Sequence, residues 1–353
     1  MQEETKTDHH QKVTRNSFLD LAKGVLILLV LIGHAIQYAS GEAYLSQMSY
    51  YNNWTFKLIY GFHMPLFMVI SGYLFYYSIE SKKSMEIIWG RLRSLVVPIF
   101  AFAFLVWLFQ FHPEFSFLDQ IRNYLSCARY TLWFLWALLY CSMGLLLVHL
   151  LAKDNVIVCI VLILFSYLTP DKWFSELYKF MFPCFLFGYL AHKNNWIEFF
   201  KQNIMIVAGV TTALYVLAIF AYYDIDTYVY ISGSCVLKKG MFDWHQLFVN
   251  LYRTLVGICG SVAFMSGLYI VHGFLSENNM VERWLVTIGT MTMGIYCIQN
   301  YFWILYSNYV DWLVEPIFLN RLLAFVVSFV VSILITMLVK RVKVLNVLFL
   351  GGR

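Results

Sequence analysis

The chain alternates between long apolar stretches and short polar segments over almost its whole length. A helix needs about 20 mostly apolar residues to cross a bilayer. We place membrane-spanning helices at ten stretches, in the ranges 18–39, 55–79, 95–111, 132–151, 155–169, 174–192, 203–223, 246–273, 285–307 and 316–339. The fifth range is short, and the eighth carries Arg253 near one end. The pattern predicts an all-α integral membrane protein with about ten transmembrane helices and no soluble domain.

Polar segments lie at both ends of the predicted helices. Residues 1–16 are polar without apolar periodicity, so we expect a flexible cytosolic tail there, and 341–353 form a short basic cytosolic tail. The transmembrane domain is then 17–340. The first apolar run could instead be a signal peptide cleaved at Ala39-Ser40-Gly41. Cleavage would discard the ionisable residues of that run, which are discussed below, so a retained helix is favoured.

Composition supports a membrane protein. Of the 353 residues, 61% are hydrophobic and only 13% are charged, whereas soluble domains carry about 25% charged residues. This surplus of apolar residues excludes two soluble domains, a disordered chain and a nucleic-acid-binding protein.

The distribution of Lys and Arg predicts the orientation. If the N-terminus is cytosolic, the inner tails and loops hold fifteen of these residues and the outer loops six, or nine with those at outer helix ends. Cytosolic segments of membrane proteins carry the excess of positive charge. We therefore expect a multi-pass plasma-membrane protein with both termini in the cytosol.

Cysteine and histidine spacing offers no metal site. The seven cysteines form no C-x-x-C pair, and the nine histidines form no H-x-x-x-H pair. Cys127 and Cys235 both fall in predicted outer loops, where a disulfide between them is compatible with the sequence but has no further support.

The first predicted helix contains three ionisable residues, Asp20, Lys23 and His34. Each costs roughly 2.5–3.5 kcal/mol in mid-membrane, which makes a functional role the default expectation. Eleven residues separate Lys23 from His34, about 16 Å along one face, and Asp20 can pair with Lys23 on that face. His34 is either a core histidine satisfied by a neighbouring helix or a general base, and the membrane setting favours the base. Gly24 and Gly33 permit close approach of another backbone or a ligand.

The second predicted helix places His63 in the outer half of the membrane, close to Pro65. Because proline removes a backbone donor and can kink a helix, His63 can either contact a substrate or cap the kink, and the sequence does not choose.

A basic cluster follows on the cytosolic side, with Lys82, Lys83, Arg91 and Arg93 ahead of Pro98. It either anchors the chain under the positive-inside rule or recognises an anionic cofactor, since arginine binds phosphates in fork geometry.

The outer loops 112–131 and 224–245 are rich in aromatic residues, which is typical of membrane interfaces and also of surfaces that stack on carbohydrate.

An ordered set of motifs resembles the membrane acyltransferase 3 family, in particular its fucose 4-O-acetylase-like and intercellular-adhesin O-acyltransferase-like branches. The motifs run from residue 18 to about 300, and each alone is weak. They are Asp20-x-x-Lys23-Gly24…Gly33-His34, Gly61-Phe62-His63-Met64-Pro65-Leu66-Phe67, Ile70-Ser71-Gly72-Tyr73-Leu74, Arg91-x-Arg93…Pro98, Leu132-Trp133-Phe134-Leu135, Phe185-Leu186-Phe187-Gly188-Tyr189-Leu190 and Gly289-x-x-Thr292-Met293-Gly294-Ile295-Tyr296.

The resemblance implies a ten-helix enzyme that takes an acyl group, usually acetyl, from cytosolic acyl-CoA. It would transfer the group to a hydroxyl of a sugar or cell-surface polysaccharide on the outer side. The family's basic-x10-His signature falls on Lys23 and His34, although many members have Arg at the first position. Where the family often has His in the ninth span, this chain has Gln299, which can hydrogen-bond but cannot transfer a proton.

The same resemblance implies a set of site residues. His34 would be the base, with His63 orienting the acceptor or the carbonyl, and Lys23, paired with Asp20, would contact the acyl carrier. Arg91 and Arg93 would hold the CoA phosphates. Direct transfer and a relay through an acyl-imidazole both fit. The other expected substrate- or acyl-CoA-binding residues are Ser71, Tyr73, Trp133, Tyr296, Gln299 and Asn300.

A membrane exporter of lipid-linked sugar or polysaccharide is the alternative, because ten spans and buried charges suit it equally well. The lack of visible repeat symmetry, and a basic cluster where a phosphorylated donor would enter, favour the enzyme.

Overall fold

The computed structural model describes residues 16–110, 114–238, 240–274, 279–310 and 314–352. The regular secondary structure of this part of the chain is helical except for a short antiparallel hairpin, β1 (Leu237–Lys238) and β2 (Met241–Phe242). The predicted tail 1–16 lies almost entirely outside the described residues. The helices are α1 (Ser17–Tyr38), α2 (Glu42–Ser46), η1 (Ser49–Asn52), α3 (Trp54–Tyr60), α4 (His63–Ser81), α5 (Ser84–Arg91), η2 (Leu92–Val96), α6 (Val97–Phe109), α7 (Phe117–Tyr130), α8 (Trp133–Ala152), α9 (Val156–Ser166), α10 (Ser175–Lys193), α11 (Trp196–Gln202), α12 (Ile204–Ala221), η3 (Ile225–Thr227), α13 (Val229–Ser232), α14 (Trp244–Phe274), α15 (Met280–Gly289), α16 (Thr292–Tyr309), α17 (Ile317–Arg341) and α18 (Lys343–Leu350).

Seven helical segments of the described chain are long and apolar enough to cross a membrane. They are Ser17–Tyr38, Trp54–Ser81, Ser84–Phe109, Trp133–Ala152, Ile204–Ala221, Trp244–Phe274 and Ile317–Arg341. The chain is thus a multi-pass membrane protein, as the apolar pattern predicts, and no soluble domain is seen among the described residues.

The other three predicted spans differ from continuous apolar helices. In the range 155–169 the helix α9 has only 11 residues. In the range 174–192, α10 has 19 residues but carries Glu176, Lys179 and His192, which lower its mean hydropathy. The range 285–307 is divided, because α15 ends at Gly289 and α16 begins at Thr292. Length and composition therefore support seven of the ten predicted spans.

Glycine brings α1 into backbone contact with α15. A Cβ atom on Gly24 would lie 2.1 Å from the carbonyl oxygen of Leu285, and one on Gly289 would lie 1.8 Å from that of Asp20. Gly33 lies against the ring of Tyr60, where a Cβ would be 2.6 Å from the ring edge. The close backbone approach predicted at Gly24 is confirmed, whereas the close neighbour of Gly33 is a side chain. The Gly24 contact fixes the helix that carries the ionisable stripe.

A second glycine contact joins α4 to α10. A Cβ on Gly72 would lie 1.9 Å from the carbonyl oxygen of Phe185, and one on Gly188 would lie 1.9 Å from that of Val69. Each helix therefore presents a glycine to the backbone of the other, and α4, which carries His63 and Ser71, is held closely against α10.

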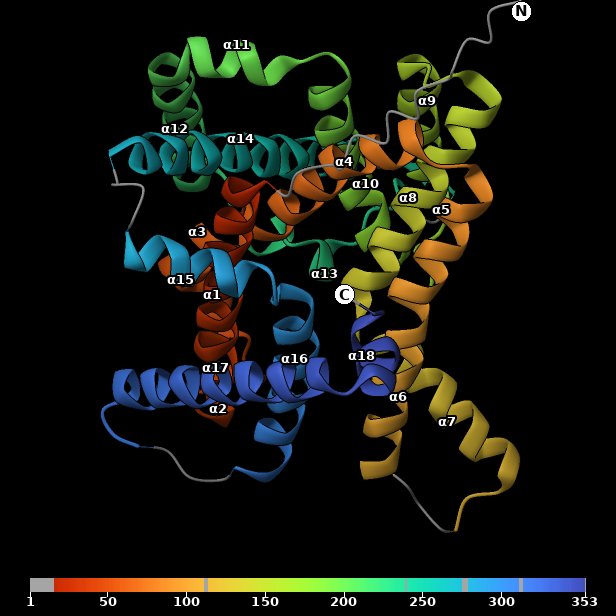
Figure 1. Ribbon diagram of the computed structural model, residues 1–353, viewed down its shortest axis with the longest axis vertical. Coiled ribbons are helices and arrows are strands. Elements are labelled where there is room, and N and C mark those ends of the chain that lie inside the picture. Colours follow the sequence, from red (N-terminus) through yellow and green to blue (C-terminus); the bar gives the residue numbers. More distant parts are fainter. Residues whose placement is uncertain (1–15, 111–113, 239, 275–278, 311–313, 353) are drawn as a thin grey trace, which may run out of the picture.

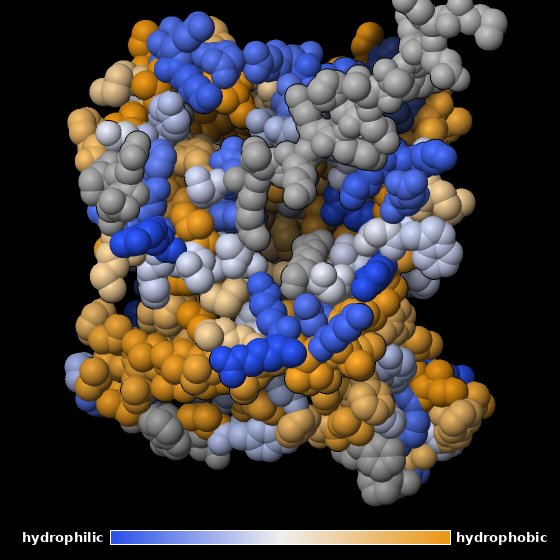
Figure 2. All heavy atoms as spheres, in the orientation of Figure 1, coloured by the Kyte–Doolittle hydropathy of each residue, from blue (hydrophilic) through white to orange (hydrophobic). Residues whose placement is uncertain are grey.

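Segments distant in sequence close the bundle. The C-terminal helix α18 lies against α6, and α17 crosses beside α1 and α16 (Figure 1). Hydrophobic residues cover α17 on the face shown in Figure 2, and hydrophilic residues gather over α11. Large apolar side chains of α17 such as Leu334 and Leu338 are exposed, as expected for a helix that faces lipid.

Cys127 and Cys235 are both free thiols. The Cys127 Sγ lies 3.4 Å from the side-chain oxygen of Gln110, and that of Cys235 lies 3.4 Å from the carbonyl oxygen of Leu237. The disulfide that their predicted positions allowed is not formed.

Candidate active site

The ionisable stripe of α1 begins with an ion pair. The Lys23 Nζ lies 2.6 Å from Asp20 Oδ1, and the aspartate side chain is buried. The predicted pairing of these residues is confirmed. It supplies a partner for a carboxylate that would otherwise be costly to bury.

Lys23 also faces a cavity of ≈ 410 Å³ enclosed by α1, α4, α8, α17, α18 and the α15–α16 junction. Its walls are mainly apolar, with Met64, Phe67 and Phe134 among them. The polar side chains that line it are Lys23, Ser71, Thr290, Thr292, Tyr296 and Lys340. Three residues predicted as binding residues, Lys23, Ser71 and Tyr296, are thus brought together.

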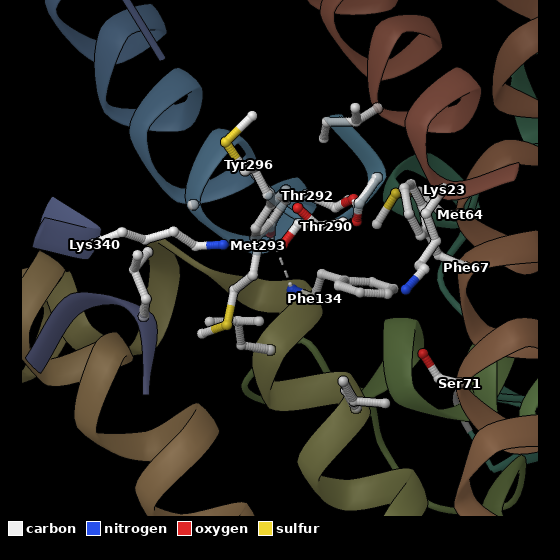
Figure 3. Close-up of a pocket in the computed structure, with 17 residues that line it drawn as sticks. Lys23, Met64, Phe67, Ser71, Phe134, Thr290, Thr292, Met293, Tyr296 and Lys340 are labelled. Atoms are coloured by element: carbon white, nitrogen blue, oxygen red, sulfur yellow. Dashed lines mark hydrogen bonds between the residues drawn. The ribbon is translucent and has the colours of Figure 1, made fainter. Parts of the chain in front are cut away.

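Lys340 is a cavity residue that the sequence reasoning missed. It comes from the last turn of α17, and Figure 3 shows it reaching into the cavity from the side opposite Lys23. Its Nζ donates a hydrogen bond to the carbonyl oxygen of Thr290, 3.3 Å away. In the sequence it counts as one more positive residue after a span, and no motif distinguishes it.

The break between α15 and α16 forms one wall of this cavity. Thr290, Met291 and Thr292 all line it, so the N-terminal end of α16 faces the cavity together with two lysines. Helix N-termini and ammonium groups both favour anions. The cavity is therefore suited to a ligand with an anionic group and an apolar part.

Tyr296 connects the cavity wall to α8. Its hydroxyl accepts a hydrogen bond from the backbone N–H of Phe134, 3.4 Å away. Trp133, the neighbouring predicted residue, does not line the cavity and packs edge-on against Phe134 and Tyr230, with ring centroids 5.8 and 6.1 Å apart.

His34 lies further along the same helix and meets α16. Its Nδ1 is 2.7 Å from Oε1 of Gln299, and its Nε2 has no protein hydrogen-bond partner in the described chain. The rings of Tyr38 and Trp303 pack against the imidazole at centroid distances of 5.9 and 6.4 Å. Nδ1 of the imidazole therefore has a hydrogen-bond partner, while Nε2 has none in the described chain and is available to a ligand.

Trp303 was also missed by the sequence reasoning. It is 1% exposed, stacks on Tyr38 at 5.7 Å, and its indole nitrogen is buried without a hydrogen-bond partner among the described residues. Nothing in the sequence distinguishes Trp303 from the other aromatic residues of its predicted span.

His63 begins α4 at the break that follows α3. Its Nδ1 is 2.8 Å from the carbonyl oxygen of Ile59, and its ring lies 4.6 Å from that of Tyr60. The side chain is buried and lines a narrow cavity of ≈ 30 Å³ together with Tyr228, Tyr230 and Arg253. The Nδ1 thus caps the break, while its Nε2 has no protein hydrogen-bond partner among the described residues.

Two predicted binding residues lie elsewhere. Tyr73 stacks on His192 at 4.2 Å and lines a separate, more apolar cavity of ≈ 340 Å³. Asn300 donates a hydrogen bond to the carbonyl oxygen of Thr131, which ties α16 to the α7–α8 turn.

The two predicted phosphate-binding arginines do not line the cavity of Lys23 either. The guanidinium of Arg91 lies over the ring of Phe75 at 4.9 Å. Arg93 is exposed, and its Nη2 would lie 3.2 Å from a Cβ on Gly352. Because Gly352 follows α18, whose Leu350 is a cavity residue, Arg93 stands near the cavity edge.

A polar network holds the loops at the end of the bundle that contains Arg253. Asp171 accepts hydrogen bonds from Lys179 Nζ at 2.8 Å and from the backbone N–H groups of Ser234 and Cys235 at 2.6 and 2.8 Å. Burial raises the pKa of the Asp171 carboxyl, but these donors outweigh burial and hold the pKa below its ordinary value. Within the described residues, no group of three His, Cys, Asp or Glu side chains is placed to hold a metal ion.

Comparison with known proteins assigns the chain to a family. A family model described as an acyltransferase domain matches residues 16–341. Nodulation protein NolL of Mesorhizobium japonicum is 25% identical over 300 residues, which are 81% of this chain and 76% of that protein. Nodulation protein NolL of Sinorhizobium fredii is 31% identical over 298 residues, 81% of this chain and 77% of that protein. No solved structure has a significant match to the chain.

Proposed function

The chain belongs to this acyltransferase family, and we propose that it transfers an acetyl group from cytosolic acetyl-CoA to a hydroxyl of a sugar or cell-surface polysaccharide on the outer side. The observation that carries the proposal is the arrangement along one face of α1. Lys23 lines a cavity that also contains the ammonium group of Lys340, and His34 has a hydrogen-bond partner on Nδ1 but none on Nε2. The separation of about 16 Å between Lys23 and His34 suits a donor with a long, flexible arm between its phosphates and its reacting carbon.

The donor would enter from the cytosol, with both termini on that side and up to ten membrane passages. The excess of Lys and Arg in the segments joined to these termini supports this orientation. In the cavity, Lys23 and Lys340 would bind the anionic part of the donor, and the apolar wall would cover its arm. Arg91 and Arg93 would contact the phosphates at the cavity edge.

The chemistry requires one base and one leaving group. Neutral His34 would accept the proton of the acceptor hydroxyl on Nε2 while the hydroxyl oxygen attacks the thioester carbonyl carbon. The C–O bond forms, the C–S bond breaks, and the imidazolium returns its proton to the thiolate. A relay, in which His34 Nε2 first accepts the acetyl group and then passes it to the acceptor hydroxyl, would use the same nitrogen atom.

The acceptor would approach past His63. The narrow cavity beside it is lined by four tyrosines, Tyr60, Tyr223, Tyr228 and Tyr230. Aromatic faces with hydroxyl tips suit a sugar, which presents both C–H and O–H groups. The Nε2 of His63 can accept a hydrogen bond from a second hydroxyl of the same ring.

Mass spectrometry of surface polysaccharides from cells with and without the gene tests this proposal. An acetyltransferase predicts that the polymer remains on the surface and loses a 42-dalton acetyl increment on each modified sugar. Loss of the whole polymer from the surface would instead indicate the exporter.

A further inference from the structure

Gln299 is the hydrogen-bond partner of the candidate base rather than a cavity residue. It is fully buried, belongs to α16 and does not line the cavity of Lys23. We propose that Gln299 is a positioning residue that fixes neutral His34 in the tautomer with its proton on Nδ1, so that Nε2 is the only proton acceptor. This inference rests on the proposed function of His34 as the base.

The orientation of the Gln299 amide follows from its two contacts. Its Nε2 donates to the carbonyl oxygen of Tyr296 at 3.2 Å, one turn earlier in α16, and its Oε1 lies 2.7 Å from His34 Nδ1. The reversed amide would place two oxygens against each other at Tyr296. With Oε1 facing the imidazole, Nδ1 must carry the proton, because an amide oxygen is only an acceptor.

Burial makes this arrangement strongly preferred. The amide is 0% exposed, and a buried amide that lacks its hydrogen bonds incurs the full cost of its desolvation. If His34 adopted the other tautomer, an unprotonated Nδ1 would face Oε1, and both acceptors would be left unsatisfied. The tautomer is therefore coupled to the packing of α16 against α1.

The surroundings of His34 contain no competing charge. The titratable groups with an interaction toward it are Tyr38 on its own helix, whose ring packs against the imidazole, and His63 on α4. Ion pairs in the described chain do not include His34. A neutral glutamine orients the ring without changing its own charge with pH.

The primary test is ¹⁵N NMR of the full-length protein labelled at histidine, in lipid nanodiscs at a pH where His34 is neutral. His34→Gln identifies the His34 signals by their loss. We expect the Nδ1–H form in the wild type and a mixture of tautomers in Gln299→Leu, which keeps the volume and removes the amide. A wild-type His34 with its proton on Nε2 would overturn the inference.

Kinetics provide the second readout, with acetyl-CoA as donor, methyl fucoside as acceptor probe and release of CoA as the signal. Gln299→Leu should lower kcat about 10²-fold through misorientation of the base, with KM for acetyl-CoA within about twofold on the same argument. Gln299→Glu should restore much of kcat and move the acid side of the pH profile to higher pH, because a carboxylate favours the imidazolium, which cannot accept a proton.

A matched control is Gln246→Glu, which makes the same change at another buried glutamine, in α14, whose amide bonds to Gly233 and Asn250. It should leave the pH profile unchanged. Wild-type kcat in Gln299→Leu, or an unshifted profile in Gln299→Glu, would contradict the positioning role. If His34→Ala were also fully active, the proposed function of His34 would fail with it; if His34→Ala were inactive, only the role of Gln299 would fail.

Discussion

The Nζ of Lys340 donates a hydrogen bond to the carbonyl oxygen of Thr290, 3.3 Å away, and so joins the end of α17 to the break between α15 and α16. This contact places a second ammonium group opposite Lys23 in the cavity (Figure 3). We expect Lys340→Gln to raise KM for acetyl-CoA about tenfold at moderate ionic strength, because a charge-assisted contact to a phosphate contributes roughly 1.5–3 kcal/mol.

Michaelis kinetics at constant acceptor concentration check this prediction. Lys343→Gln is the control, since Lys343 is exposed on α18 and does not line the cavity. Equal KM values for the two variants would show that Lys340 does not contribute to donor binding.

Neither Arg91 nor Arg93 lines the cavity, and of the two it is Arg93 that stands near its edge. Replacing both with Gln should raise KM for acyl-CoA more than it changes turnover at saturating donor, because they would contribute ground-state binding. Activity against donor concentration, corrected for membrane abundance, gives the answer. An equal loss at low and saturating donor would indicate a defect in folding or insertion.

The glycine contact between α4 and α10 makes a stability prediction. Gly188→Ala should cost about 1–3 kcal/mol by overpacking, since the new Cβ would lie 1.9 Å from the carbonyl oxygen of Val69. Gly267→Ala is the matched control because a Cβ there meets nothing within 4 Å. Thermal unfolding in detergent should show a lowered midpoint for Gly188→Ala alone; a similar midpoint for both would contradict the close packing.

The lowered pKa of Asp171 leads us to predict how the free energy of unfolding depends on pH. Its pKa is lowered in the folded protein, so its contribution is complete above the ordinary aspartate pKa of about 3.9 and is lost as the pH falls through the folded value. Asp171→Asn should therefore unfold at a lower temperature than the wild type at pH 7. Melting curves at pH 7 and pH 3 should show this difference shrink; a difference that persists at pH 3 would rule out the carboxylate as its cause.

The sequence predicts the helical membrane architecture and several site contacts for identifiable physical reasons. Asp20 and Lys23 are three residues apart on one helix, so local geometry alone brings them together. Gly24 and Gly33 mark close contacts because only small residues permit them. The order of the motifs indicates the family, which the comparison with known proteins confirms.

The remaining features depend on which helices meet. His34 and Gln299 are 265 positions apart, and no periodicity within either helix says that they share a hydrogen bond. Lys340 reads as an ordinary positive residue after a span, and it becomes a cavity residue only because α17 ends beside the α15–α16 break. That break falls inside one continuous apolar range, which is why hydropathy predicts a single span there.

The most direct test of the central claim is acetyl transfer by His34 variants at matched membrane abundance. With radiolabelled acetyl-CoA and membranes that contain the acceptor polysaccharide, His34→Ala and His34→Gln should both fall to background. Loss of a general base costs roughly 10²–10⁴ in rate, and an amide cannot accept the hydroxyl proton. Neither variant should insert less well than the wild type, because both side chains are neutral. If His34→Gln keeps more than about a tenth of wild-type turnover, which the same magnitude excludes for a lost base, His34 is not the base and His63 becomes the residue to test.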